Sequence, residues 1–403
     1  MEQSAGSPVH PAGRPRAPAA LVLGKGITAL GVVRSLALAG RTPFLVSADE
    51  GFVAFSRHCR LLPSGQSHSA GEDQLPALLE RLAEPMVLMP CSDGWASAVC
   101  ALTPELARRF PASLAPPEAL RGLIDKSAFA EVLRVFDIPH PRTHALASEA
   151  DLTGLAPELF ENAFLKPCES HEFLRRFDRK AFRIKDREEA LVRWREAHAA
   201  GLPMVLQEYV PGPPTAHYFV DGFMDQQGEI RARFARQRVR MDPPDFGNST
   251  YMVSVPLEEV EGAVRSLDRL LKGIRYRGIF SAEFKLDPRD GLFKILEVNS
   301  RAWWYVGFAT DCGVNVCEMA YRDALGLPVA SATRYAAGRP CVYPHHDWRT
   351  WAHSSDPSLG RLLRTLASWV GASQPIFRWD DPLPSLAESW AYLVARWGPH
   401  SRP

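Results

Sequence analysis

The stretch IFSAEFKLDPRDGLFKILEVNSRAWW, residues 279–304, predicts a β-hairpin. Two apolar runs flank the segment DPRDG at 287–291, whose proline, aspartates and glycine are typical of a turn. Side chains alternate across a strand, so Glu297 and Asn299 share one face of the second strand. A turn centred on 287–291 places Glu283 of the first strand near Glu297. We therefore expect Glu283, Glu297 and Asn299 to converge on one face of the hairpin.

These three side chains offer the oxygen ligands that a hard divalent cation prefers. Mg²⁺, or Mn²⁺ in its place, binds a few carboxylates together with phosphate oxygens and water. A carboxylate and an amide inside an apolar run are costly unless something uses them. An antiparallel hairpin with one polar, solvent-facing side would show the same alternation. The hairpin alone leaves both interpretations open.

Basic residues elsewhere in the chain favour a nucleotide. Lys166 ends the short apolar stretch AFLKP at 163–167, Lys126 follows the tripeptide LID, and Arg301 comes directly after the hairpin. Each lysine by itself is typical of a solvated surface. Together with the acidic trio they indicate a nucleoside triphosphate site, where positive side chains neutralise the transferring phosphoryl group. The chain contains no GxxxxGK[ST] P-loop, so the phosphates must be held differently.

A glycine turn marks the first ordered part of the chain. ALVLGKGITALGVV at 20–33, followed by the apolar stretch PFLVSA at 43–48, predicts a βαβ unit. Gly24 and Gly26 match a loosened dinucleotide-binding fingerprint, which would suit an NAD-dependent oxidoreductase. Many βαβ units need such a tight turn without binding a dinucleotide, and we favour that alternative.

The rest of the chain reads as alternating strands and helices. A third strand and a helix are predicted within 86–99, with Asp93 as the helix cap, and the composition changes near residue 115. The further expectations are one helix over 120–138, a charged loop at 168–184, a helix at 186–199, a strand at 204–212 closed by Pro211 and Gly212, a hairpin at 216–240 turning at 225–228, and two helical segments after 330.

The composition is that of an ordinary globular protein. The chain has 403 residues, 46% hydrophobic and 23% charged, with a formal net charge of +1, which fits two or three domains. A charge near zero argues against a nucleic-acid binder, and no apolar stretch approaches the length of a membrane span. Residues 1–18 are rich in proline, alanine and glycine and are expected to form a disordered tail. Seven cysteines without a CxxC pair predict reduced thiols in a cytoplasmic protein.

Five motifs in order resemble the ATP-grasp superfamily. They are IDKSAF (124–129), FLKP (164–167), QEYVPG (207–212), FSAEFKLD (280–287) and ILEVNSRAWW (295–304). The match covers about 20–325, and RVRMDPPDFG at 238–247 is similar to a segment of the carboxylate–amine ligases related to D-aspartate ligase. The large-subunit domains of carbamoyl-phosphate synthetase resemble the chain more distantly.

The resemblance implies an α/β fold, α+β in its ATP-grasp part. A Rossmann-like pre-ATP-grasp domain is expected at 19–115 and a two-lobed ATP-grasp domain at 116–330. The lobes would span about 116–206 and 207–330, and residues 331–403 would form a C-terminal extension.

The resemblance also implies roles for individual residues. ATP phosphates would contact Lys126 and Lys166, adenine would lie against Gln207, Glu208, Tyr209 and Val210, and the metal would be held by Glu283, Glu297 and Asn299. Arg301 would stabilise the transferring phosphoryl group or the acyl phosphate, and Arg238 and Arg240 would hold the acid substrate or a phosphate. The chain departs from the pattern at Asn299-Ser300-Arg301, where the family often has Asn-Pro-Arg, and in having no glycine between 167 and 180.

The function that follows is ATP-dependent joining of a carboxylate and an amine through an acyl phosphate, with ATP and Mg²⁺ as cofactors. The expected partners are small-molecule acid and amine substrates, without nucleic acid or membrane. Homodimers are common among relatives, and the sequence leaves this open. The alternatives are an ATP-grasp enzyme acting on bicarbonate or another carboxylate without amide formation, a catalytically silent nucleotide-binding protein, and the NAD-dependent oxidoreductase.

Overall fold

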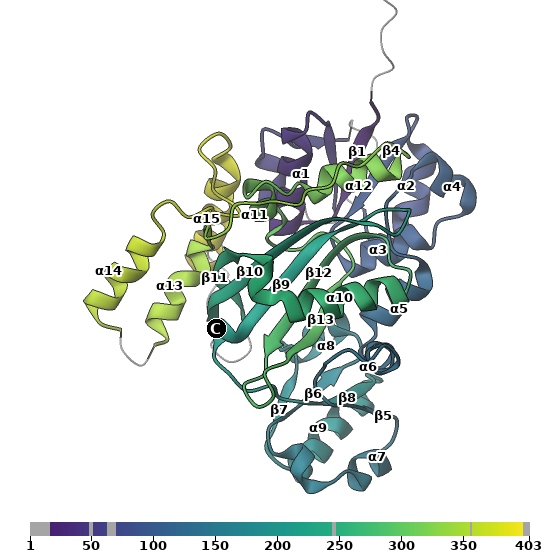
Figure 1. Ribbon diagram of the computed structural model, residues 1–403. Helices are drawn as coiled ribbons and strands as arrows, with labels where there is room; N and C mark the ends of the chain where they lie inside the picture. The colour runs from purple at the N-terminus through teal and green to yellow at the C-terminus, as the bar shows by residue number, and fades with distance from the viewer. Residues whose placement is uncertain (1–16, 48–50, 63–69, 244–246, 355–356, 398–403) are drawn as a thin grey trace, which may run out of the picture.

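The protein is built around three β-sheets. The computed structural model describes residues 17–47, 51–62, 70–243, 247–354 and 357–397. Figure 1 shows a parallel sheet near the N-terminus, a large central sheet and a small sheet that is set apart below it. A glycine-turn α/β unit followed by two further sheets agrees with the predicted fold class. In the described part of the chain, no helix combines the length and apolar character needed to cross a membrane.

The N-terminal sheet is parallel, in the order β3-β2-β1-β4. Its elements are β1 (Ala19–Leu23), α1 (Gly26–Leu38), β2 (Pro43–Val46), η1 (Gly51–Phe55), β3 (Arg60–Leu61), η2 (Glu72–Gln74), α2 (Leu75–Arg81), β4 (Met86–Pro90), α3 (Asp93–Cys100) and α4 (Pro104–Arg109). The predicted βαβ unit is confirmed. Gly24 has φ +138°, and a Cβ there would lie 2.8 Å from the Cβ of Cys91, so this glycine lets β4 approach the turn.

The predicted cap of α3 was wrong by one residue. Ser92 is the N-cap and accepts a hydrogen bond from the backbone nitrogen of Trp95 at 3.1 Å. Asp93 is instead the first residue of the helix, where its carboxylate stays available for a partner outside the helix.

The small sheet is antiparallel, in the order β5-β8-β6-β7. This part of the chain comprises α5 (Pro117–Ile124), α6 (Lys126–Val135), β5 (Thr143–Leu146), α7 (Glu149–Gly154), η3 (Pro157–Phe160), β6 (Ala163–Pro167), α8 (Ser170–Phe177), β7 (Phe182–Ile184), α9 (Arg187–Ala199) and β8 (Met204–Glu208). Apolar residues of α7, α8 and α9 pack with those of the sheet in one core.

Two predictions in this part were wrong. The single helix expected over 120–138 is split into α5 and α6, because extended Asp125 caps α6 by accepting from the backbone nitrogen of Ala128 at 2.7 Å. The loop expected at 168–184 contains α8 and β7. The phenylalanines Phe173, Phe177 and Phe182 pack edge to face or tilted within this segment and give it a core of its own.

The large sheet is antiparallel, in the order β13-β12-β9-β10-β11-β14. Its strands and connections are η4 (Pro214–Ala216), β9 (His217–Met224), β10 (Ile230–Asp242), β11 (Asn248–Val255), η5 (Leu257–Val260), α10 (Glu261–Gly273), β12 (Gly278–Leu286), β13 (Phe293–Asn299), α11 (Val306–Asp311), α12 (Val316–Ala324) and β14 (Pro340–Val342). The predicted hairpins at 216–240 and 279–299 are confirmed, and Glu283 lies opposite Glu297 as expected.

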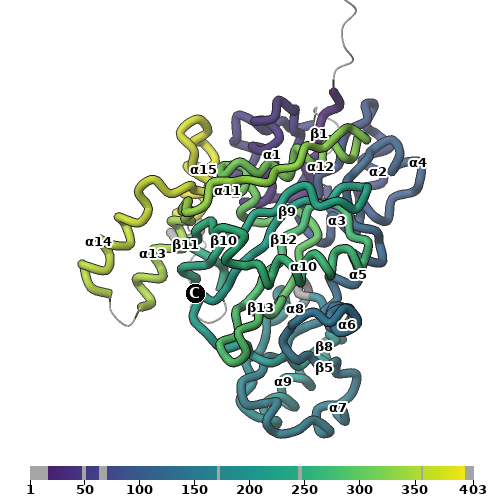
Figure 2. Tube along the Cα trace, in the orientation of Figure 1, coloured from purple at the N-terminus to yellow at the C-terminus, as the bar shows by residue number. Residues whose placement is uncertain are grey.

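Each face of the large sheet has its own core. On one face α10, α5 and α6 pack against β9 and β12. On the other, α1 packs against α11 and α12, which Figure 2 shows side by side although they are far apart in sequence. The N-terminal sheet and the large sheet therefore share a core, and their relative position is set by buried apolar contacts.

The C-terminal segment forms three helices where two were expected: α13 (Pro344–Ala352), α14 (Leu359–Ser368) and α15 (Leu383–Trp397). Asp347 of α13 is fully buried and accepts hydrogen bonds from Arg240, Thr250 and Trp369 at 2.6–3.1 Å. Arg34 of α1 donates to the buried Asp381, which precedes α15, at 2.9 Å. These buried polar contacts attach the C-terminal helices to the body of the protein.

Candidate active site

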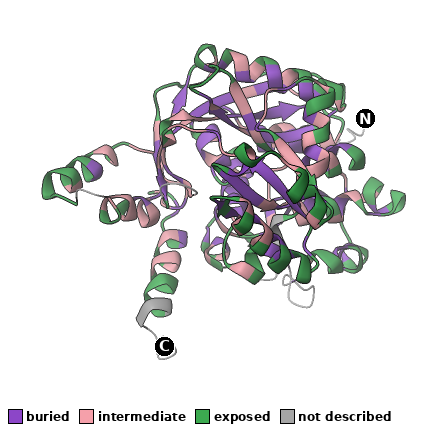
Figure 3. Ribbon diagram, turned by 90° about the horizontal axis from the view of Figure 1, so that it is seen from below, coloured by how far each residue is buried: buried purple, intermediate pink, exposed green. Residues whose placement is uncertain are grey.

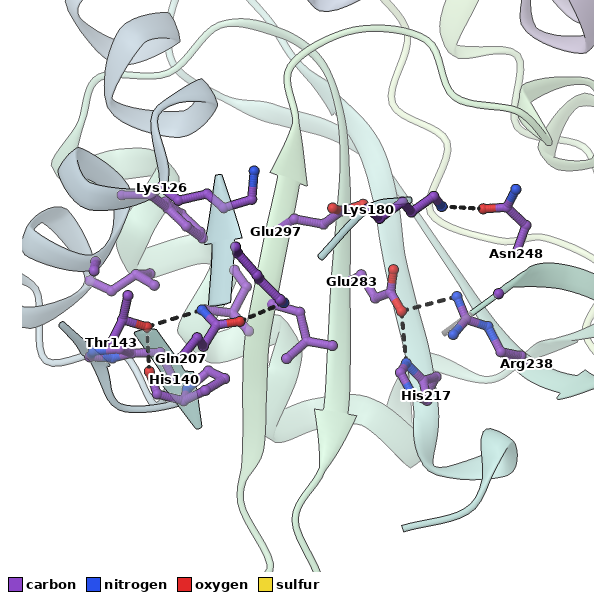
Figure 4. A pocket seen from close by; sticks show the side chains of 18 of the residues that line it. Lys126, His140, Thr143, Lys180, Gln207, His217, Arg238, Asn248, Glu283 and Glu297 are labelled. Carbon is purple, nitrogen blue, oxygen red and sulfur yellow. Dashed lines mark hydrogen bonds and ion pairs between the residues drawn. The ribbon is translucent and has the colours of Figure 1, made fainter. Parts of the chain in front are cut away.

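A cleft between the small and the large sheet brings together residues from both. Figure 4 shows Lys126 and Gln207 on one side of the cleft and Glu283, His217 and Arg238 on the other. The charged and polar residues that line it are Lys126, His140, Thr143, Lys166, Lys180, Gln207, His217, Arg238, Asn248, Glu283 and Glu297. Of the predicted site residues, Lys126, Lys166, Gln207, Arg238, Glu283 and Glu297 lie in this cleft.

The small-sheet wall presents two lysines. Lys166 at the end of β6 donates to the side-chain oxygen of Gln207 at 2.6 Å, and Gln207 donates to Thr143 at 3.0 Å. Burial and the nearby positive charge of Lys126 lower the pKa of Lys166 to about 8. Burial also lowers the pKa of Lys126, although the charge of Glu297 partly offsets this. Two ammonium groups held close together in a partly desolvated cleft are matched to an anionic ligand.

The large-sheet wall presents the two carboxylates of the hairpin. Glu283 is bound by His217 at 2.7 Å and by Arg238 at 3.0 Å. Burial would raise the pKa of Glu283, but the charge of Arg238 and the hydrogen bond from His217 hold it well below its usual range. Glu283 is therefore ionised at neutral pH.

Glu297 differs from Glu283 in its surroundings. It is exposed, and its carboxylate accepts a hydrogen bond from Asn299 at 3.2 Å. In the described part of the chain, Glu297 forms no salt bridge. Like charges directly opposite each other on paired strands repel, so the pairing of Glu283 with Glu297 favours a cation between them. Among the described residues, no group of three His, Cys, Asp or Glu residues could hold a metal, so the candidate site has only these two carboxylates and the amide oxygen of Asn299.

The sequence reasoning missed five of the polar cleft residues, which are His140, Thr143, Lys180, His217 and Asn248. His217 begins β9, and Lys180 precedes β7 and donates to Asn248 at 2.7 Å. The contact of Lys180 joins the segment after α8 to the beginning of β11. A lone histidine and a lone lysine carry no sequence signal, because their position depends on which strands pair.

Arg240 lies outside the cleft, although Arg238 is two residues away on the same strand. The register of β10 against β11 shifts on both sides of Arg240, so the two side chains do not share a face. Arg240 binds Asp347 at 2.6–3.1 Å and Ser368 at 2.9 Å. The structure thus gives Arg240 a role in attaching the C-terminal helices, in place of the expected contact with substrate or phosphate.

Arg301 forms a bridge at the edge of the site. Its guanidinium donates to both carboxylate oxygens of Asp93 at 2.9 and 3.2 Å, and to the side-chain oxygen of Asn299 at 2.9 Å. The first turn of α3 is thereby connected to the hairpin. Arg301 orients Asn299 and lies next to the candidate metal ligands rather than among the residues that line the cleft.

Of the four residues expected to bind adenine, one lines the cleft and three do not. Gln207 lines the cleft, whereas Glu208 binds Arg289 at 2.7 Å and the backbone nitrogen of Arg142 at 3.1 Å. Tyr209 packs edge to face on Phe164, and Val210 is buried. The side chains of Glu208, Tyr209 and Val210 thus make contacts outside the cleft lining, and the expected contact with adenine stays a prediction.

No family model matches the chain. The chain is similar to the D-aspartate ligase of Enterococcus faecium (strain Aus0004), with 29% identity over 245 residues, 59% of this chain and 58% of that protein. The chain therefore matches less than two thirds of the length of this relative.

Solved structures confirm the expected fold. A biotin carboxylase from Campylobacter jejuni in complex with β,γ-ATP superposes with a TM-score of 0.61 and 18% identity, over 79% of this chain and 74% of that one. An L-amino acid ligase from Bacillus licheniformis superposes with a TM-score of 0.56 and 14% identity, over 77% and 75%. The chain has the ATP-grasp fold of these proteins.

Proposed function

We propose that the chain is an ATP-dependent carboxylate–amine ligase that forms an amide or peptide bond and releases ADP and phosphate. The observation that carries the proposal is the cleft in which Lys126 and Lys166 face the acidic hairpin of Glu283 and Glu297. The similarity to a D-aspartate ligase supports joining of an amino acid as the first activity to test.

The cleft residues fit a Mg-nucleotide. Lys126 and Lys166 would bind phosphates, and Gln207 orients Lys166 through their 2.6 Å hydrogen bond. Glu283 is ionised and Glu297 is exposed, and the two carboxylates lie directly opposite each other on paired strands. This arrangement suits Mg²⁺, which is commonly bound through one or two carboxylates together with substrate phosphates. When bound, the ion would neutralise charge on the phosphates.

The proposed chemistry has two steps. An oxygen of the substrate carboxylate attacks the terminal phosphorus of ATP, the bond to the ADP oxygen breaks, and an acyl phosphate forms. The amine nitrogen then attacks the acyl carbon, the bond to the phosphate oxygen breaks, and the nitrogen loses a proton. The first step is needed because a carboxylate is a poor electrophile. The protein contributes position and charge, so no nucleophilic side chain is required.

Arg238 is the residue that we assign to the anionic substrate or its phosphate. It lines the cleft, is buried, and is fixed by Ser249 at 2.8 Å and by Glu283 at 3.0 Å. Arg301 acts from the edge by holding Asn299 between the hairpin and α3. Small-molecule acids and amines are the proposed partners, and a cytoplasmic location is proposed from the sequence, which has seven cysteines and no CxxC pair.

Two alternatives share the same fold. An enzyme that activates bicarbonate or another carboxylate without forming an amide would use the same cleft, and so would a silent nucleotide-binding protein. The oxidoreductase alternative has less support, because the close approach of β4 to Gly24 accounts for the glycine turn by packing.

The test is release of ADP and phosphate from Mg-ATP with a panel of amino acids, dipeptides and other carboxylic acids, each alone and with amines. Glu297→Ala provides the blank. We expect release that requires both an acid and an amine. Release with bicarbonate or an acid alone would favour the first alternative, and tight ATP binding without release under any condition would favour the second.

A further inference from the structure

We propose that Asp242 is a positioning residue of the active site. It connects α13 of the C-terminal extension to Asn248 and so places Lys180 over the cleft, where Lys180 binds an anionic group of the ligand. This inference rests on the proposed function, because the anionic group is taken to be a phosphate of ATP. Figure 3 shows the C-terminal helices beside the large sheet, with much of their own surface exposed. The proposal gives this extension a role in ligand binding.

α13 holds the end of β10 at two places. Arg240 binds Asp347 of α13 at 2.6–3.1 Å. Asp242, the last residue of β10, is 5% exposed, and its carboxylate binds Arg349 of α13 and His353 at the C-cap of that helix, both at 3.1 Å. A buried carboxylate is costly unless it is paired, so these two partners set the position of the end of the strand.

The end of β10 needs this support because its pairing with β11 is irregular. The register shifts on both sides of Arg240, just before Asp242. An irregularity of this kind disrupts the ladder of hydrogen bonds locally, and bulges often re-aim a side chain next to an active site. The ladder alone therefore does not determine the direction of the last residues of β10, and the ion pairs with α13 do.

The position of Asp242 is passed on to the beginning of β11. Asp242 and Asn248 lie directly opposite each other in the pairing of the two strands. A Cβ on Gly247 would lie 2.1 Å from the carbonyl carbon of Asp242, so a glycine is required for this close approach. Because the two backbones are in contact, a shift of Asp242 moves Asn248 as well.

Asn248 in turn holds Lys180. Its side-chain oxygen accepts a hydrogen bond from the ammonium group of Lys180 at 2.7 Å, which Figure 4 shows near Glu283. Lys180 is exposed, and it has no carboxylate partner within the part of the chain that the structure describes. A lysine on a flexible stem stays in one place only where an acceptor holds it. The position of Lys180 therefore depends on Asn248.

The charge of Lys180 acts at the site proposed for the phosphates and the metal. Lys180 lines the cleft together with Lys126 and Lys166. Burial lowers the pKa of Lys166 most, and the positive charge of Lys180 contributes to the same shift. Burial would raise the pKa of Glu283, but positive groups lower it, with Arg238 first and Lys180 among the others. A third ammonium group at this place would stabilise the negative charge of bound phosphates.

The two contacts of α13 lead to different places. Asp347 binds Arg240, which lies outside the cleft, whereas Asp242 lies opposite Asn248, which lines it. Loss of the contact at Asp347 would leave Asp242 with both of its partners. If α13 served only as an anchor, the two contacts would have the same effect on ligand binding. The proposal predicts an effect for Asp242 alone.

The test combines two measurements on the full chain. Calorimetry gives the affinity for Mg-ATP. Mass spectrometry of the protein without ligand gives the rate at which acetic anhydride modifies the side-chain amine of Lys180. Asp242→Asn removes the charge with little change in volume. Asp347→Ala is the matched control, because it breaks the other contact of α13 with the sheet.

Lys180→Met should weaken Mg-ATP binding about tenfold, the effect of losing one charged contact in a cleft. Asp242→Asn should weaken it about three- to tenfold when Lys180 is present and less than about twofold in the Lys180→Met background, because residues that act through one another are not additive. The folded Asp347→Ala variant should bind Mg-ATP like the wild type.

Lys180 should be modified faster in Asp242→Asn and in Asn248→Ala than in the wild type. The reason is that the lost hydrogen bond stabilised the charged form of the amine, which does not react. The rate should be unchanged in Asp347→Ala. Arg349→Met removes a 43% exposed partner of Asp242 and tests the same connection from α13 if Asp242→Asn fails to fold.

Three results would overturn the proposal. They are Mg-ATP binding by Asp242→Asn like that of the wild type, an effect of Asp242→Asn that adds fully to that of Lys180→Met, and an unchanged rate of modification of Lys180. Equal effects of Asp242→Asn and Asp347→Ala would show that α13 is an anchor only. If wild-type protein bound no Mg-ATP, the proposed function would fail, and the modification rates alone would decide whether Asp242 positions Lys180.

Discussion

Replacement of Glu297 by alanine is expected to abolish ATP turnover and to leave the fold intact. The side chain is exposed, and it accepts a hydrogen bond from Asn299 at 3.2 Å. Loss of such a bond costs about 1 kcal/mol or less. Removal of a charge that faces Glu283 across the hairpin offsets part of this cost. We therefore expect a Tm within about 4 °C of wild type.

The effect on activity should be much larger. Alanine removes one of the two carboxylates assigned to the metal, and this carboxylate also faces Lys126 and Lys166 across the cleft. Removing one preorganised charge-stabilising group from an active site typically costs about 100- to 1,000-fold in turnover. We expect at least a 100-fold loss, with a higher Mg²⁺ concentration needed for half-maximal activity.

The assay is ADP release as a function of Mg²⁺ concentration, with Tm measured on the same preparations. Glu161→Ala, which removes an exposed carboxylate outside the cleft, is the control and should behave like wild type. Near-normal turnover of Glu297→Ala with an unchanged Mg²⁺ dependence would refute the metal assignment. A large fall in Tm would show that Glu297 supports the fold instead.

Three further predictions concern other parts of the protein. Lys166→Met should weaken ATP binding, measured by calorimetry, at least tenfold. Because the pKa of Lys166 is about 8, its positive charge is lost as the pH rises. The ATP affinity of the wild type should therefore fall from pH 7 to 9, and the affinity of the variant should not. Unchanged affinity would contradict the phosphate role. Gly24→Val should destabilise the protein by about 3 kcal/mol or more in urea, because φ is +138° and the new Cβ would meet Cys91 at 2.8 Å; a stable variant that selectively loses NAD binding would favour the oxidoreductase. Asp347→Ala should lower the free energy of unfolding by about 3 kcal/mol, because Arg240 loses its buried partner, and the folded variant should keep its affinity for ATP. Loss of ATP affinity without loss of stability would indicate that Arg240 takes part in ligand binding.

Local patterns were enough to predict the acidic half of the site. A DPRDG turn between two alternating strands predicts the hairpin and brings Glu283 near Glu297, and an irregularity of the pairing between Glu283 and Phe284 then places the two carboxylates directly opposite each other. The βαβ unit was predictable for the same reason, since its turn and its apolar periodicity involve neighbouring residues.

Contacts between distant segments were beyond such patterns. Alternation predicts one face for Arg238 and Arg240, but the irregular pairing of β10 with β11 separates them, and Asp347 then binds Arg240 from more than one hundred residues away. His217 lies in the site because β9 pairs with β12, and the residues next to His217 in the sequence give no indication of this pairing. Misreading α8 and β7 as a loop has a similar cause, because the aromatic core of that segment forms only on folding.

The sequence by itself predicted the acidic hairpin, because turn chemistry and alternation encode it, and the ordered motifs indicated the fold class and the two cleft lysines through their resemblance to a known family. Only the tertiary structure decided which arginine enters the cleft, that Arg301 connects the hairpin to α3, and that many apolar side chains of α14 and α15 are exposed. Apolar residues at helical spacing indicate that a helix packs against an apolar surface, whereas the packing of the whole chain decides which surface that is.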